Sequence, residues 1–170
     1  MTSINIPVFA DTNRLLMAIF NEFFAGQDIA IRTLFSEEMP TPAIVARRER
    51  RSGNGEARNA DPRFIEPSVV AVNTITSGLE AESEGSELQE MCRIALLQAQ
   101  LEQRSYPGIG HIAAIENSTS ASQVSDWATT TGIVQYAALP KGAVRFESVF
   151  RLLIRPPVTG GAINRFRPLH

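Results

Sequence analysis

Residues 67–104 constrain the fold most, because their apolar residues change from the spacing of a strand to that of a helix. Residues 69–76 are rich in β-branched side chains and end at Ser77-Gly78, which predicts a mostly buried strand. From Leu88 onward, helical spacing predicts a helix that runs to Arg104 and turns one broad face inward. The residues of that face are Leu88, Met91, Cys92, Ile94, Ala95, Leu97, Ala99 and Leu101.

The start of this helix is predicted from a capping pattern. Ser86 followed by Gln89 has the capping-box spacing, in which each side chain bonds a free amide of the first turn. Four glutamates then lie at or before the helix start, where the helix dipole favours negative charge. They are Glu82, Glu84, Glu87 and Glu90. This position gives the carboxylates a sufficient structural role without catalysis.

The rest of the chain supplies further elements of both kinds. A helix capped by Asp11 or Thr12 is predicted up to Gly26, and strands are predicted over residues 28–34, 43–50 and 109–116. Residues 133–139 and 144–155 form a predicted hairpin around a type I turn over residues 139–142. The fold class is therefore α+β: a mixed or antiparallel β-sheet with two main helices packed on it. We expect a single domain over residues 1–157 and an extended basic C-terminal arm over residues 158–170.

The last strand alternates between two kinds of side chain. Apolar residues occupy one face of this strand, which we assign to the core, and charged residues occupy the other face, which we assign to solvent or a partner. The apolar set is Val144, Phe146, Phe150, Leu152 and Ile154, and the charged set is Arg145, Glu147, Arg151 and Arg155.

Charge is unevenly distributed along the 170 residues, whose formal net charge of −2 argues against a dedicated nucleic-acid binder. Arginine outnumbers lysine fifteen to one, a bias that suits either interface contacts or a biased genome composition. One cluster flanks and occupies a long polar loop over residues 51–62, and comprises Arg47, Arg48, Arg50, Arg51, Arg58 and Arg63. A second cluster comprises Arg145, Arg151, Arg155, Arg165 and Arg167. The first could contact DNA phosphates, a neighbouring subunit or solvent.

Two aromatic residues lie in segments without a clear fold pattern. Trp127 belongs to a serine- and threonine-rich stretch, where it serves either as a plug that pins this loop or as an anchor for a partner. Phe166 lies in the arm, which is too short and polar to fold alone. We therefore expect the arm to bind a surface, such as a neighbouring copy.

The sequence contains few residues of the types that bind metals or act as catalytic groups. His111 has no aspartate, cysteine or second histidine at ligand spacing, so no metal site is predicted. Cys92, the single cysteine, lies on the apolar face and reads as a buried structural thiol. The N-terminus lacks a signal-peptide pattern and no stretch is apolar enough to span a membrane, so we expect assembly in the cytoplasm and no membrane partner. A small hydrolase or ligand-binding domain that uses His111 and residues 117–131 remains an alternative.

The order of elements resembles the tail terminator proteins of long-tailed (siphovirus-type) bacteriophages. Three parts of residues 11–157 carry the resemblance: residues 42–48 leading into a glycine-bearing loop, the strand 68–76 leading into the helix 87–104, and the last strand. The last strand reads Gly-Ala-Val-Arg-Phe from Gly142 and continues as Phe-Arg-Leu-Leu-Ile-Arg from Phe150.

The resemblance implies a structural virion protein without catalytic residues or a cofactor. Members of this family form a hexameric ring that caps the tail tube, stops its polymerisation and presents a surface to the head connector. The implied partners are other copies of the chain, the tail tube protein and a head-closure or connector protein, with genomic DNA passing through the lumen without sequence-specific binding. The implied location is the neck of the virion, at the head–tail junction. Another neck protein, a head-closure or adaptor protein, is the alternative in the same setting.

Overall fold

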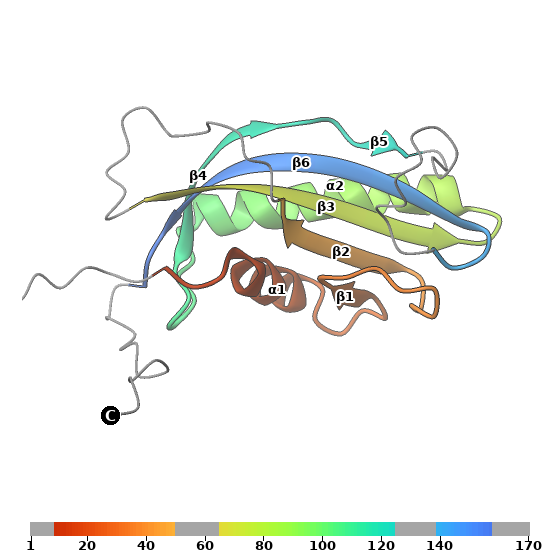
Figure 1. The fold of residues 1–170 in the computed structure, drawn as a ribbon, viewed down its shortest axis with the longest axis horizontal. Coiled ribbons are helices and arrows are strands. Elements are labelled where there is room, and N and C mark those ends of the chain that lie inside the picture. Colours follow the sequence, from red (N-terminus) through yellow and green to blue (C-terminus); the bar gives the residue numbers. More distant parts are fainter. Residues whose placement is uncertain (1–8, 50–64, 125–138, 158–170) are drawn as a thin grey trace, which may run out of the picture.

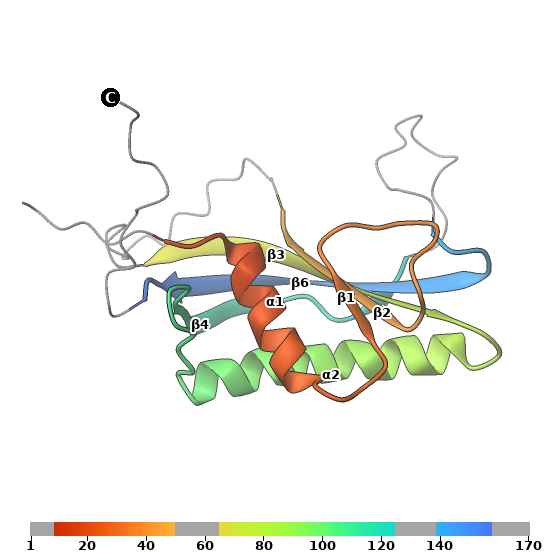
Figure 2. The ribbon, with the colours of Figure 1, turned by 90° about the horizontal axis from the view of Figure 1, so that it is seen from below.

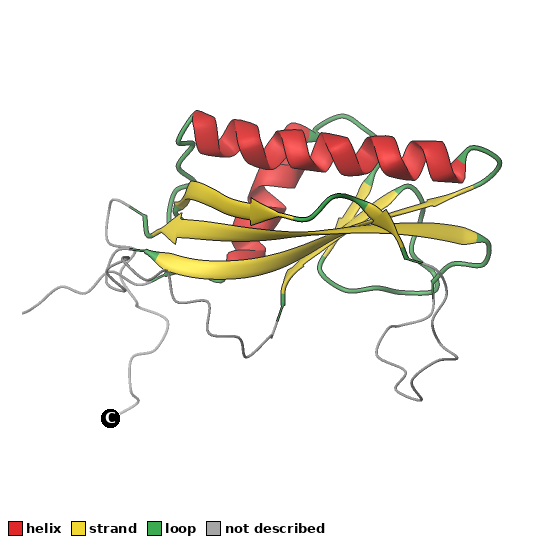
Figure 3. Ribbon diagram, turned by 90° about the horizontal axis from the view of Figure 1, so that it is seen from above, coloured by secondary structure: helices red, strands yellow, loops and turns green. Residues whose placement is uncertain are grey.

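A computed structural model describes residues 9–49, 65–124 and 139–157, and it confirms the predicted α+β single-domain fold. Its helices are α1 (Thr12–Phe23) and α2 (Ala81–Leu101). The strands are β1 (Ala30–Arg32), β2 (Ala43–Arg48), β3 (Glu66–Ser77), β4 (His111–Ser118), β5 (Ser122–Gln123) and β6 (Ala143–Arg155). Both helices lie on the same side of the sheet (Figure 3).

The sheet is mixed and has the strand order β1-β2-β3-β6-β4 (Figure 1). β1 and β2 are parallel, whereas β2, β3, β6 and β4 pair antiparallel. The longest pairing joins β3 and β6 over the whole of β3, from Glu66 opposite Ile154 to Ser77 opposite Ala143. β5 continues the edge begun by β4, because it also pairs with β6. The two longest strands therefore form the middle of the sheet.

The main core fills the space between the sheet and the two helices. α1 supplies Leu15, Leu16, Ile19 and Phe20, which are buried against the sheet and α2. α1 runs across the long axis of α2 (Figure 2). From the sheet, Val70 and Val72 of β3 and Phe150, Leu152 and Ile154 of β6 complete this core.

α1 begins where the sequence predicts. The Asp11 carboxylate caps it by accepting a hydrogen bond from the amide of Asn13, at 3.2 Å. Thr12 and Ser68 share a buried hydrogen bond of 2.9 Å, which ties the first residue of α1 to β3.

α2 begins earlier than predicted, and the proposed capping box is wrong. The helix starts at Ala81, so Ser86 and Gln89 lie inside it. Gln89 is 1% exposed, and its side-chain amide donates to the backbone oxygen of Val72 in β3 at 2.7 Å. Glu82 and Glu84 do lie in the first turn. The helix ends at Leu101 rather than at Arg104.

The inward face of α2 is also narrower than predicted. Leu88, Cys92, Ala95 and Ala99 are buried, but Ile94 and Leu101 point away from the sheet and are 43% and 78% exposed. Ile94 and Leu101 follow each other at a spacing of seven residues, which places them on one side of the helix. The outer side of α2 therefore carries two exposed aliphatic side chains.

Other boundaries differ by a few residues. β1 spans only Ala30–Arg32, and β2 ends at Arg48. The turn before β6 closes one residue later than predicted: the amide of Ala143 donates to the oxygen of Pro140, at 3.0 Å. Gly142 then occupies the third position with a φ of 75°, which a type II turn requires. The first strand of the predicted hairpin, residues 133–139, falls almost wholly outside the described residues.

Candidate subunit-contact surfaces

The sheet face opposite the helices carries arginines from two strands that are distant in sequence. Pairing places Arg47 of β2 opposite Ala71, and Arg145 and Arg151 of β6 opposite Ile75 and Val69. Side chains alternate between the faces of a strand, so these arginines share the face that points away from Val70 and Val72. Arg155 follows the same alternation. The structure thus places four of the predicted interface residues, Arg47, Arg145, Arg151 and Arg155, on one face of the sheet, and we call this the arginine face.

Phe35 lies between two of these arginines. The guanidinium carbons of Arg47 and Arg145 are 5.6 Å and 5.4 Å from the centre of the Phe35 ring, a distance suited to cation–π attraction. Phe35 also packs against a small second core that includes Met39, Val45 and Ile75. The segment between β1 and β2 therefore covers one end of the arginine face.

The prediction that Arg145 faces solvent or a partner is wrong. Its side chain is 3% exposed, because the Phe35 ring lies over it. Its guanidinium lies 3.6 Å from the Glu147 carboxylate, two residues further along the same strand. A buried cation requires such compensation, since removing a charge from water is costly. Arg145 consequently acts as part of the fold and is not exposed to contacts outside the chain.

Arg151 and Arg155 lie towards the other end of β6. Arg151 forms an ion pair of 2.7 Å with Glu116 of β4, across the strand pairing. Arg155 is exposed and lies opposite His111. The Arg151–Glu116 ion pair joins β4 to β6 at the edge of the sheet, where the register shifts twice.

Arg48 lies on the opposite side of the sheet from Arg47. It pairs with Val70, which belongs to the helix-side core, and its guanidinium contacts the Glu66 carboxylate at 2.7 Å. Its backbone amide donates to the side-chain oxygen of Asn13 in α1, also at 2.7 Å. Arg48 therefore joins β2, β3 and α1 and is separate from the arginine face. The remaining predicted site residues lie outside the described part: Arg50, Arg51, Arg58, Arg63, Trp127, Arg165, Phe166 and Arg167.

The exposed surface of α2 is acidic, and Glu82 on it accepts a hydrogen bond of 3.5 Å from Gln123 of β5 at the edge of the sheet. Glu82, Glu84, Glu87 and Glu90 are exposed on its first half, and Arg93 is the one basic side chain of the helix. Arg93 forms a bidentate ion pair with Glu90, which lowers the pKa of Glu90 chiefly through the hydrogen bond. Within the described ranges, no ion pair involves Glu84 or Glu87. We call these four glutamates the acidic row.

A groove of about 320 Å³ separates the C-terminal half of α2 from α1, and sequence analysis did not predict it. Its apolar floor consists of Ile19, Phe23, Ala95 and Ala99. Its rim consists of Glu22, Gln98, Arg104 and Tyr106. Glu22 and Arg104 are 82 residues apart in sequence, so no local spacing signals their contact.

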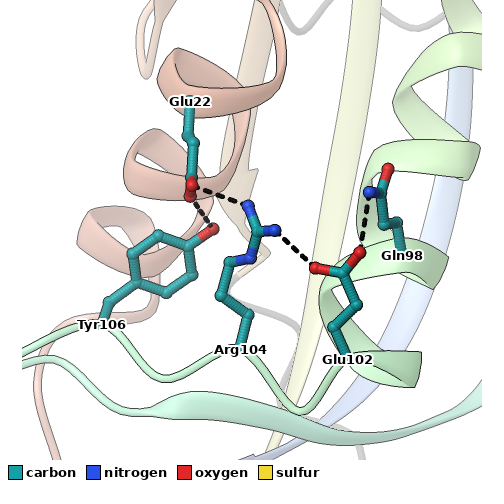
Figure 4. A network of polar contacts seen from close by, with 5 residues as sticks. All are labelled: Glu22, Gln98, Glu102, Arg104 and Tyr106. Atoms are coloured by element: carbon teal, nitrogen blue, oxygen red, sulfur yellow. Dashed lines mark hydrogen bonds and ion pairs between the residues drawn. The ribbon is translucent and has the colours of Figure 1, made fainter.

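Figure 4 shows the polar network at this rim. Glu22 accepts hydrogen bonds from Arg104 at 2.6 Å and from the Tyr106 hydroxyl at 2.8 Å. Arg104 also donates to Glu102 at 2.5 Å, and Glu102 accepts from Gln98 at 2.8 Å. Burial, and then the bond to Glu22, raises the pKa of Tyr106, while the bond from Gln98 is the main cause of the lowered pKa of Glu102. Two carboxylates thus share one guanidinium, which leaves the rim with an excess negative charge.

His111 and Cys92 lie in different parts of the fold. Burial, and then repulsion by Arg155, lowers the pKa of His111, whose Nδ1 has no hydrogen-bond partner within the described residues. Cys92 is buried, as predicted, and burial raises the pKa of its thiol.

No cluster of three or more potential metal ligands occurs in the described part of the chain. Neither α1 nor α2 has the length and apolar character needed to span a membrane.

No known protein-family model matches the sequence, and a search of curated proteins finds no similar sequence.

Proposed function

We propose that the protein is a structural subunit of a bacteriophage tail: a tail terminator that forms a ring, with six copies expected, on the end of the tail tube. The ring stops tube polymerisation and joins the tail to the head-closure or connector protein. Genomic DNA passes through its lumen without sequence-specific contacts. On this proposal the protein works by assembly in the host cytoplasm and in the virion neck, with no catalytic turnover and no cofactor.

The observation that carries the proposal is the uneven distribution of charge over one domain: α2 exposes four glutamates, whereas the far face of the sheet carries four arginines, two of which pair with Glu147 and Glu116. The acidic row belongs to α2, which lies on one side of the sheet, and the arginine face lies on the other side. A ring of identical subunits needs two different, complementary surfaces on each subunit, because every contact joins the front of one copy to the back of the next. Opposite charge supplies complementarity and orients the encounter.

The loop between β2 and β3 contains further arginines. β2 ends at Arg48, and the chain continues through Arg50, Arg51, Arg58 and Arg63 before β3 begins at Glu66. Three acidic residues, Glu49, Glu56 and Asp61, accompany these four arginines. We propose that this loop contacts the acidic row of the adjacent copy, where Glu84 and Glu87 have no ion-pair partner among the described residues.

A charge-reversal experiment tests the contact. We expect Glu84→Lys with Glu87→Lys to weaken ring or tube-cap formation about tenfold or more, because each lysine then faces an arginine. Glu37→Lys with Glu38→Lys is the matched control: both glutamates are exposed, they lie between β1 and β2, and the net charge changes equally. Adding Arg50→Glu and Arg51→Glu to the α2 variant should restore part of the assembly. Equal losses in the control pair, or no loss at either low or high salt, would contradict the proposed contact.

A further inference from the structure

We propose that the groove between α1 and α2 binds the basic C-terminal arm, residues 158–170, of an adjacent copy. This inference rests on the proposed ring, which brings a second copy into reach. The arm inserts Phe166 over the apolar floor of the groove, and Arg165 and Arg167 contact the carboxylates of the rim.

The groove has a small apolar floor inside a polar rim. The floor is made by Ile19, Phe23, Ala95 and Ala99, of which Phe23 is the most exposed, and the polar rim makes up the larger part of the exposed lining. The groove of about 320 Å³ is large enough for an aromatic ring and part of its backbone. The arm offers a single aromatic residue, Phe166, between Arg165 and Arg167.

The charges of the two partners are complementary. Glu22 and Glu102 share the guanidinium of Arg104, which leaves one carboxylate charge without a cation of its own in this network. The arm contains two arginines and no aspartate or glutamate. A second guanidinium would balance the rim, and its planar fork matches carboxylate geometry.

The path of the chain favours a groove on an adjacent copy. β6 ends at Arg155, whose backbone oxygen lies against Gly110, and Gly110 in turn pairs with Tyr106 at the rim of the groove. Pro156-Pro157 follows directly, and two prolines favour an extended chain that does not fold back at once. The 13 residues of the arm can span about 40 Å when extended.

Cross-linking of full-length chains tests the inference. One chain carries Asn164→Cys in the arm, and the other carries Ser105→Cys at an exposed position beside Arg104. The control partner carries Ser83→Cys, an exposed serine at the opposite end of α2. The native Cys92 stays in place because it is buried. Pairs are mixed with tail-tube ends, treated with a short bismaleimide and analysed by mass, with ring formation measured in the same samples by light scattering.

We expect the Ser105→Cys pair to link at least about tenfold more than the Ser83→Cys pair, because docking raises the local thiol concentration. Phe166→Ala in the arm-bearing chain should reduce this linking roughly tenfold, as the loss of one buried aromatic side chain implies. A synthetic peptide of residues 158–170 should compete, and the same peptide with both arginines changed to glutamate should not.

The contrary outcomes separate the two proposals. Rings with equal linking at Ser105→Cys and Ser83→Cys, or with linking unaffected by Phe166→Ala, would overturn the docking and leave the ring intact. A single chain that carries both Asn164→Cys and Ser105→Cys and links only internally would show that the arm occupies its own groove. The absence of both rings and links, with tube ends present, would overturn the docking and the proposed function together.

Discussion

Gly85 of α2 lies so close to Phe146 of β6 that a methyl group on Gly85 would stand 2.8 Å from Cδ2 of the ring. The hydroxyl of Thr76 would lie equally near. Three buried hydrogen bonds enforce this approach, because Thr74, Thr76 and Gln89 join β3 to α2. Thr74 donates to the oxygen of Gly85 at 2.9 Å, Thr76 to that of Ala81 at 2.5 Å, and Gln89 to that of Val72 at 2.7 Å. The N-terminal half of α2 is therefore fixed on the sheet by small and polar residues.

We predict that Gly85→Ala destabilises the protein by about 1–3 kcal/mol, the usual range for forcing a methyl group into a packed core. In an open helix the same change would stabilise by about 1 kcal/mol, so the sign reports the close contact. Urea unfolding followed by circular dichroism measures the difference. The exposed Ser83→Ala is the control and should be neutral or slightly stabilising. A Gly85→Ala variant more stable than the parent would contradict the described packing.

We predict that Thr74→Val costs about 1 kcal/mol of unfolding free energy, because it keeps the side-chain shape and removes a buried hydroxyl bond. The measurement is the urea concentration at the midpoint of unfolding, compared between variants whose unfolding transitions have the same slope. Val70→Thr makes the reverse change in the same strand, because it adds a hydroxyl group at a position that is buried among apolar side chains. The contact between Thr74 and Gly85 is unimportant if Thr74→Val is as stable as the parent.

We predict that Phe35→Leu destabilises by about 1–2 kcal/mol, because the ring contacts the guanidinium groups of both Arg47 and Arg145. Leucine retains much of the apolar contact with the second core and lacks the electrostatic attraction of an aromatic face. Leu34→Ala serves as the control, since Leu34 is 70% exposed and should change stability by less than about 0.5 kcal/mol. Thermal unfolding of both variants measures the contrast, and equal effects would argue against the stacked arrangement.

We predict that stability declines as the pH falls from 7 to 5, and that His111→Gln reduces this slope. Burial lowers the pKa of His111, so the unfolded chain binds its proton at a higher pH than the folded chain. The stabilisation is complete above the unfolded pKa of about 6.5 and is lost as the pH falls towards the folded value. Arg155 is the nearby cation that adds to the effect. An unchanged slope in His111→Gln, measured by urea midpoints at each pH, would contradict this assignment.

The strand β3 and the C-terminal half of α2 were predictable because large apolar residues carry their periodicity. The beginning of α2 was not, since its buried face is built from Ala81 and Gly85, with Gln89 bonded to β3. Small residues mark close packing, which hydrophobic spacing does not detect. The same limitation explains Ile94 and Leu101: their apolar character suggested the core, and the face set by Gly85, Cys92 and Ala99 turns them outward.

The candidate surfaces were predictable in part. Strand alternation placed Arg145 and Arg151 on one face correctly, but it carried no information about Phe35, which arrives from a separate segment and buries Arg145. The groove rim joins Glu22 to Arg104 and Tyr106 through the tertiary fold alone. Sequence patterns report the faces of an element, whereas the contacts between distant elements depend on their packing.

The mass of the purified full-length protein, alone and mixed with tail tubes, tests the proposed function most directly. Light scattering gives the copy number, and negative-stain imaging shows where the protein binds. The proposal predicts rings of six, or a monomer that becomes a sixfold cap on tube ends. Twelvefold rings, or binding only to the head portal, would indicate a neck adaptor instead. A monomer that binds neither structure would contradict an assembly role and direct attention to a ligand near His111.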